Sequence, residues 1–227
     1  MSVHLNAELE QLKQRLLYLG SLAENSMRKA GLALKRMDSE LAKEVIKYDN
    51  QVDIKEVEIE EECLKILALH TPVANDLRFV IATLKINNDL ERVSDLAVNI
   101  AERVIFLEKQ PAPAIPFDFD KMWQLSVNML KNSLDAFVQG NVALAKQVCE
   151  DDDAVDAINK SMYNLVYDGI RKHPDQAEAF IHYLSISRHL ERVADYATNI
   201  CEDVIYMIEG KIVRHQPEEF LSWEDDQ

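Results

Sequence analysis

The chain has 227 residues, a formal charge of −15, 48% apolar residues, and only five glycines and six prolines. The acidic balance argues against a nucleic-acid backbone or an anionic membrane surface as a direct partner. The apolar fraction allows a sizeable core, and the scarcity of turn residues favours helices over sheet.

The first half is predicted to form three long helices, over residues 3–37, 39–69 and from Pro72 to about 109. Apolar residues recur at the three- and four-residue spacing of an amphipathic helix throughout these ranges. Asp38 or Ser39 is a suitable N-cap for the second helix, and Thr71-Pro72 predicts a cap followed by proline at the first helical position.

The segment Gln110–Asp118 contains three prolines in QPAPAIP and cannot continue a helix. Three more helices are predicted after it, over residues 118–138, 141–172 and 174–209, with Gly140-Asn141 separating the first two. The tail after Gly210 is predicted to lie outside the helices, with Trp223 against the body.

Residues Leu90–Ile105, LERVSDLAVNIAERVI, return as Leu190–Ile205, LERVADYATNICEDVI, with eleven of sixteen positions identical and no gap. The chain is therefore interpreted as a tandem duplication. The predicted fold is all-α, with two three-helix bundles related by an internal twofold axis or a translation. The predicted division is 1–109 and 118–209 for the two repeats, 110–117 for the connector and 210–227 for the tail.

Carboxylates recur at four-residue spacing on two helices of each half. The first half has Asp49–Asp53 and Glu91–Asp95, and the second has Asp152–Asp156 and Glu191–Asp195. Like charges at this spacing repel each other on an exposed helix. Keeping them in both copies therefore suggests that a cation binds between them.

The two pairs of each half are predicted to meet at the same height. Asp53 lies 18 residues before Thr71 and Glu91 lies 20 after it, while Asp156 lies 17 before His173 and Glu191 lies 18 after it. In antiparallel helices this places the pairs within roughly 3 Å along the axis.

Oxygen ligands favour hard cations, so magnesium, manganese, calcium or iron is expected, with zinc a further possibility. The candidate ligands are Asp49, Asp53, Glu91, Asp95, Asn99, Glu102, Asp152, Asp156, Glu191, Asp195, Asn199 and Glu202.

Two simpler readings compete with the metal. Arg92 and Arg192 can each neutralise a neighbouring carboxylate, and an acidic stripe can be a solvated face. The three cysteines, Cys63, Cys149 and Cys201, are interpreted as isolated reduced thiols, since no CxxC pattern predicts a zinc site. With no signal peptide or spanning segment predicted, a cytoplasmic location is expected.

The length, the two repeats, TPVANDLRFVIATLKI and SRHLERVADYATNICEDVIY together resemble the PhoU family of phosphate-transport regulators. The resemblance implies metal clusters, often of iron, at the acidic pairs. It implies a cytoplasmic negative regulator that contacts the ATPase subunit of the phosphate ABC transporter and a membrane sensor histidine kinase. It also implies homodimers in some members, no nucleic-acid partner, and membrane association only through protein partners.

Three functions follow, of which the regulatory adaptor is preferred. A di-metal carboxylate enzyme is disfavoured, because no Glu is followed three residues later by His and no nucleophile–base arrangement is visible. The chain is therefore predicted not to be an enzyme. The third reading is a metal-free scaffold whose acidic stripe binds a basic partner.

Overall fold

The computed structural model describes residues 3–213, and within that range the chain folds into long α-helices and one 3₁₀ turn. The predicted packing of Trp223 lies outside the described residues. The elements are α1 (Val3–Arg36), α2 (Ser39–His70), α3 (Ala74–Leu107), α4 (Asp120–Gln139), α5 (Val142–Lys172), η1 (Pro174–Gln176) and α6 (Ala177–Glu209).

The predicted caps of α2 and α5 are confirmed. The Asp38 side chain accepts a hydrogen bond from the backbone N–H of Leu41 at 3.0 Å, and Asn141 accepts one from Leu144 at 3.1 Å. Each satisfies a backbone donor that a helix start leaves free. Gly140 ends α4 with φ +60°, a left-handed conformation that glycine adopts without strain.

The two helix starts predicted at prolines are wrong. Thr71 adopts the left-handed conformation (φ 44°) and closes α2, so it cannot be the extended cap that a proline at the first helical position needs. Val73, which is extended, precedes α3 instead. In the second half, Pro174 begins the 3₁₀ turn η1, and α6 starts after it at Ala177.

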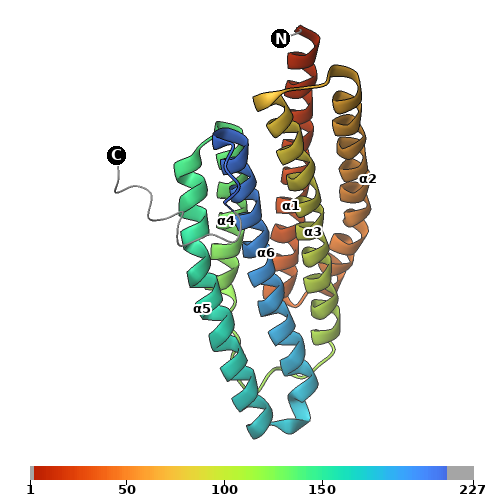
Figure 1. The fold of residues 1–227 in the computed structure, drawn as a ribbon. Helices are drawn as coiled ribbons and strands as arrows, with labels where there is room; N and C mark the ends of the chain where they lie inside the picture. Colours follow the sequence, from red (N-terminus) through yellow and green to blue (C-terminus); the bar gives the residue numbers. More distant parts are fainter. Residues whose placement is uncertain (1–2, 214–227) are drawn as a thin grey trace, which may run out of the picture.

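The helices α1–α3 form one antiparallel bundle and α4–α6 form a second one beside it (Figure 1). The duplicated segments lie on α3 and α6, which run side by side in opposite directions through the centre of the molecule (Figure 1). A translation would have left them parallel, so the two halves are related by an approximate twofold axis.

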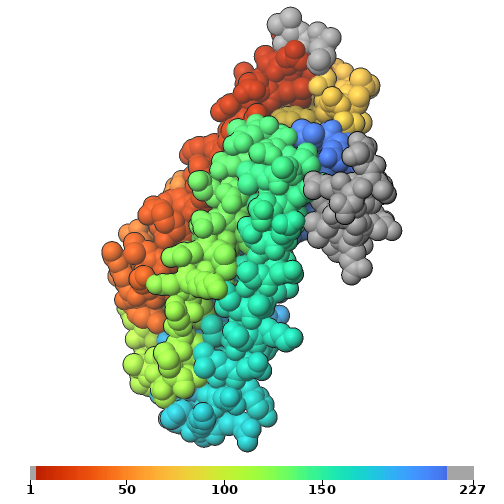
Figure 2. Space-filling model, turned by 90° about the vertical axis from the view of Figure 1, so that its left-hand side faces the viewer, coloured from red at the N-terminus to blue at the C-terminus, as the bar shows by residue number. Residues whose placement is uncertain are grey.

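The core is continuous across both bundles, because α3 and α6 bury residues toward both their own bundle and each other. Leu90, Val93 and Ile100 of α3 are fully buried, as are Leu190 and Ile200 of α6. On the face shown in Figure 2, α4 and α5 lie along the molecule with α1 beside α4. Among residues 3–213, no helix has the length and apolarity needed to cross a membrane.

The connector between the halves is held by aromatic packing. The ring of Phe117 stacks on Tyr183 of α6 with centroids 4.4 Å apart, and Ile115 lies against α5 at Gly169. These contacts fix the proline-containing segment across the ends of the second bundle, where it delivers the chain to α4.

Candidate metal centres on two helix pairs

The first acidic cluster lies between α2 and α3. Burial raises the pKa of Asp49, a hydrogen bond donated by Ser94 Oγ at 2.7 Å lowers it, and the charges of Asp53 and Asp95 raise it again. Burial also raises the pKa of Glu91, as do the charges of Asp95 and Asp53. Because these effects act between helices, the two pairs are within electrostatic range of each other.

The second cluster lies between α5 and α6 and is more strongly perturbed. Burial, followed by the charges of Asp156, Asp195 and Glu191, raises the pKa of Asp152 from 3.8 to about 7. Burial and Asp156 likewise raise the pKa values of Glu191 and Asp195. All four carboxylates of the second half therefore act on one another.

One difference between the two clusters is a hydrogen-bond donor. Ser94 of the first repeat corresponds to Ala194 of the second, so no equivalent hydroxyl reaches Asp152. The Oδ1 atom of Asp152 is buried and makes no hydrogen bond, whereas Oε2 of Glu91, which also makes none, lies 3.4 Å from Nε of Arg92 in an ion pair. Buried oxygen atoms that lack donors favour a bound cation or a proton.

The arginines next to the clusters behave differently in the two halves. Arg92 lies 3.4 Å from Glu91 and 3.6 Å from Asp95, so the predicted ion-pair alternative is seen in the first half. Arg192 instead donates a hydrogen bond to the Tyr196 hydroxyl at 3.3 Å. Its guanidinium also lies over the Tyr196 ring, 6.0 Å from the centroid, and its charge lowers the pKa values of Glu191 and Asp195.

The carboxylates fit a cation in chemistry, but they are not closed around one. In the described part of the chain, no set of three or more His, Cys, Asp or Glu side chains is arranged to hold a metal ion. The donors are oxygens, five of the carboxylates have raised pKa values, and the buried Oδ1 of Asp152 has no hydrogen-bond partner, which matches a hard cation. Side-chain rotation would be needed to bring the ligands to bonding distance.

The remaining candidate ligands lie along the same helices. Glu102 is exposed and lies 3.5 Å from Arg103, and Asn99 is half-buried on α3. Asn199 lines a groove formed with α2 and α3. Glu202 lines a smaller pocket with Lys85 and Tyr206.

The structure brings together several polar residues that the sequence did not connect. The three cysteines are free thiols, as predicted, but Cys149 and Cys201 lie close enough for Cys149 to raise the pKa of the Cys201 thiol. Lys85 of α3 and the buried Asp203 of α6 form an ion pair at 3.0 Å. Neither pair was visible in the sequence, because each depends on how two helices are rotated against each other.

Within the described residues, six α-helices and an acidic pair on two helices of each half define a duplicated all-α repeat protein. Residues 16–104 and 119–204 each match the family model described as the PhoU domain. The chain belongs to the PhoU family.

Relatives and solved structures agree over nearly the whole chain. The phosphate-specific transport system accessory protein PhoU homologue of Aquifex aeolicus is 39% identical, covering 92% of this chain and 95% of the relative. PhoU homologue 1 of Thermotoga maritima is 36% identical, covering 92% and 90%. The crystal structure of PhoU from Pseudomonas aeruginosa superposes with a TM-score of 0.88 at 34% identity, covering 91% of this chain and 99% of that one.

A second crystal structure, of the phosphate transport system regulatory protein PhoU from Streptococcus pneumoniae, has a TM-score of 0.81 at 34% identity, covering 92% and 99%. The predicted all-α fold of two repeats is confirmed by these matches. The names of the relatives describe accessory and regulatory proteins, in agreement with the prediction that the chain is not an enzyme.

Proposed function

We propose that this chain is a metal-binding regulatory adaptor that restrains phosphate uptake. It contacts the ATPase subunit of a phosphate ABC transporter and a sensor histidine kinase, and it represses phosphate-regulated genes when phosphate is plentiful. Family membership and the names of the relatives support the link to phosphate transport.

The metal part of the proposal rests on the mutual crowding of carboxylates. The crowding is clearest at Asp152, which has a pKa of about 7 and a buried oxygen without a hydrogen-bond partner. The protein alone therefore does not stabilise the ionised form of this carboxyl group. The ligands would be Asp49, Asp53, Glu91 and Asp95 in one half and Asp152, Asp156, Glu191 and Asp195 in the other. A bound iron, manganese, magnesium, calcium or zinc ion would brace the helix pair that holds it and offset part of the local negative charge.

The residues of the chain support an adaptor rather than a catalyst. The acidic pairs of each half lie on two neighbouring helices, α2 with α3 and α5 with α6, and none of the eight carboxylates is fully buried. A surface site of this kind presents charge to a partner protein. The metal would therefore act on partner binding, by setting the shape and the charge of this surface.

A deletion strain tests the adaptor function. We expect loss of the gene to switch on phosphate-regulated genes in phosphate-rich medium, measured with a phosphatase or promoter reporter. Complementation with the wild-type chain should restore repression, and the double variant Glu91→Ala/Asp95→Ala should restore it only partly. Normal repression in the clean deletion would refute the proposal.

The matched control is a carboxylate pair at the same spacing on α2 that belongs to neither cluster. Glu40 and Glu44 are four residues apart and exposed. The variant Glu40→Ala/Glu44→Ala should complement like the wild type, which separates loss of the site from loss of negative charge in general.

A metal-free scaffold is a second candidate, favoured by one observation. The ion pairs of Arg92 with Glu91 and Asp95 already neutralise part of the first cluster. Under this alternative the acidic pairs bind a basic partner directly, and removing metal from the protein leaves its partner binding unchanged.

A further inference from the structure

Helix α2 presents three aliphatic side chains to solvent along one line. Ile54, Val57 and Leu64 are 52%, 49% and 53% exposed, and at 100° per residue they lie within about 80° of one another around the helix axis. Ile59 and Cys63 fill the opposite, buried side of the same helix. These three exposed residues are called the α2 stripe below.

The α2 stripe is not a consequence of the duplicated fold. Aligning Asp49 with Asp152 and Asp53 with Asp156 places Ala157, Lys160 and Tyr167 of α5 at the equivalent positions. The second half therefore has a small residue, a charge and an aromatic ring where the first half has three aliphatic side chains. The fold tolerates polar residues at these positions, so its stability does not require the stripe.

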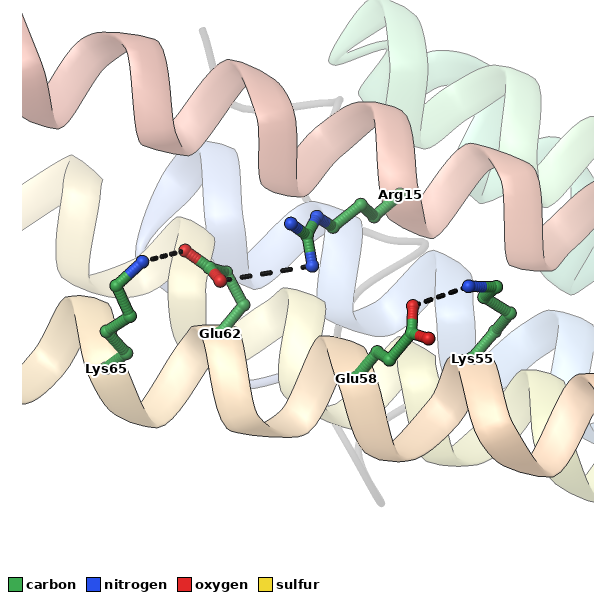
Figure 3. A network of polar contacts seen from close by, with 5 residues as sticks. All are labelled: Arg15, Lys55, Glu58, Glu62 and Lys65. Atoms are coloured by element: carbon green, nitrogen blue, oxygen red, sulfur yellow. Dashed lines mark hydrogen bonds and ion pairs between the residues drawn. The ribbon is translucent and has the colours of Figure 1, made fainter.

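The edge of the stripe that faces α1 is already neutralised. Glu62 lies between Arg15 of α1 at 3.9 Å and Lys65 at 2.9 Å, and Lys55 pairs with Glu58 at 2.6 Å (Figure 3). Cations and carboxylates alternate along this edge. A partner gains no net charge attraction there.

The edge that faces α3 has an excess of negative charge. Glu56 and Glu60 line a groove of about 410 Å³ between α2, α3 and α6. The groove holds four carboxylates and one ammonium, Lys85, which is itself bound to Asp203 at 3.0 Å. Glu61 is exposed on the arc of the stripe itself. Cationic side chains would therefore be attracted along this one side.

We propose that the α2 stripe is the docking site for an amphipathic helix of a partner protein, with its apolar face on Ile54, Val57 and Leu64. Lysine or arginine residues along one edge of that helix reach Glu60 and Glu61. A second copy of this chain is disfavoured as the occupant, because it would bring acidic edges together, and an anionic membrane is disfavoured for the same reason.

This inference deepens the proposed adaptor function by naming the surface that a partner uses, and it rests on that function only for the partner's identity. It does not depend on the metal, because Glu60 and Glu61 are not among the candidate ligands.

The test uses the full chain and a synthetic, fluorescently labelled helical peptide of about 20 residues, with leucines at helical spacing and lysines along one flank. Binding is measured by fluorescence anisotropy. We expect Val57→Ser/Leu64→Ser to weaken binding by about tenfold or more. Glu60→Gln/Glu61→Gln should weaken binding and reduce its dependence on salt. A peptide with glutamates in place of lysines should not bind.

The matched control is Tyr163→Ser/Tyr167→Ser on α5, which removes exposed apolar side chains from the other half. It should bind the basic peptide like the wild type. Equal binding by the wild type and by Val57→Ser/Leu64→Ser, or equal loss in the α5 control, would overturn the docking site. So would a change in oligomeric state of the stripe variant by sedimentation, since a second copy would then be the occupant.

The two proposals fail separately. If the stripe variant loses peptide binding but the deletion strain represses normally, the docking site stands and the phosphate adaptor function is rejected. If the deletion strain is derepressed but the stripe variant binds the peptide normally, the docking site is rejected alone.

Discussion

Asp49 and Asp152 occupy equivalent positions in the two halves, yet only one of them receives a hydrogen bond. Ser94 donates to Asp49 at 2.7 Å, whereas Ala194 stands in the equivalent place beside Asp152. A hydrogen bond to a carboxylate stabilises the charged form. Burial is the largest cause of the raised pKa at both positions, and more neighbouring carboxylates raise the pKa of Asp152, to about 7. The Ser94 hydrogen bond, which lowers the pKa of Asp49, has no counterpart there.

This difference predicts the pH dependence of the metal-free protein. The raised pKa means that folded Asp152 keeps a proton which the unfolded chain releases, so stability falls as pH rises from about 4 to about 7. Asp152→Asn cannot ionise and should remove this fall. We expect the variant to be more stable than the wild type above pH 7 by about 1 kcal/mol after solvent screening, measured by urea unfolding in chelator.

The matched control is Asp49→Asn, which removes a carboxylate that already has a donor. The stability that Asp49→Asn gains above pH 7 should be smaller, because the Ser94 hydroxyl stabilises the negative charge of Asp49 in the wild type. A larger gain for Asp49→Asn than for Asp152→Asn would contradict the assignment of the unstabilised charge to the second half.

At the scale of the helices, the two bundles meet through α3 against α6 and through α1 against α4. The second contact depends on Gly31. A Cβ atom at that position would lie 2.3 Å from the ring of Trp123, far inside van der Waals contact. The glycine lets the indole ring lie against the backbone of α1.

Gly31→Ala should therefore destabilise the protein, although alanine is the better helix former by about 1 kcal/mol. We expect a net loss of about 1–3 kcal/mol, measured by chemical unfolding. Gly20→Ala is the control, because its Cβ would meet the flexible end of Leu134 at 2.9 Å. Gly20→Ala should lower the free energy of unfolding by less than Gly31→Ala does. An equal or greater loss would argue against the close approach of Trp123 to Gly31.

The ion pair of Lys85 with Asp203 joins α3 to α6. Lys85→Met would leave the buried carboxylate of Asp203 without its ammonium, and we expect a loss of about 2 kcal/mol because one side of the pair is open to water. The double variant Lys85→Met/Asp203→Leu should recover most of the stability lost in Lys85→Met, as measured by thermal unfolding. A double variant as unstable as the single one would show that the pair contributes little to the joining of the halves.

At the scale of the whole molecule, the architecture could be predicted because the repeat keeps eleven of sixteen residues without a gap. Six helices followed from the period of the apolar residues, and the connector followed from its prolines. The matching height of the acidic pairs rests on counting along the chain and stays a prediction. The choice between twofold axis and translation did not follow, since identical segments fit either. It depends on how α3 and α6 meet, which is a matter of side-chain packing across a sequence distance of one hundred residues.

The local errors have physical reasons. Thr71-Pro72 has the composition of a helix start, but the left-handed Thr71 ends α2 and moves the start of α3 to Ala74. The contact between Cys149 and Cys201 depends on the rotation of two helices, which spacing alone does not determine.

The central claim is that the duplicated carboxylates hold cations, and elemental analysis of protein purified without chelator tests it most directly. We expect the wild type to contain bound metal. The variants Glu91→Ala/Asp95→Ala and Glu191→Ala/Asp195→Ala should each lose the metal bound by the half that they alter. The variant Glu40→Ala/Glu44→Ala should contain as much metal as the wild type. A wild type without metal, or pair variants with unchanged metal content, would contradict the account.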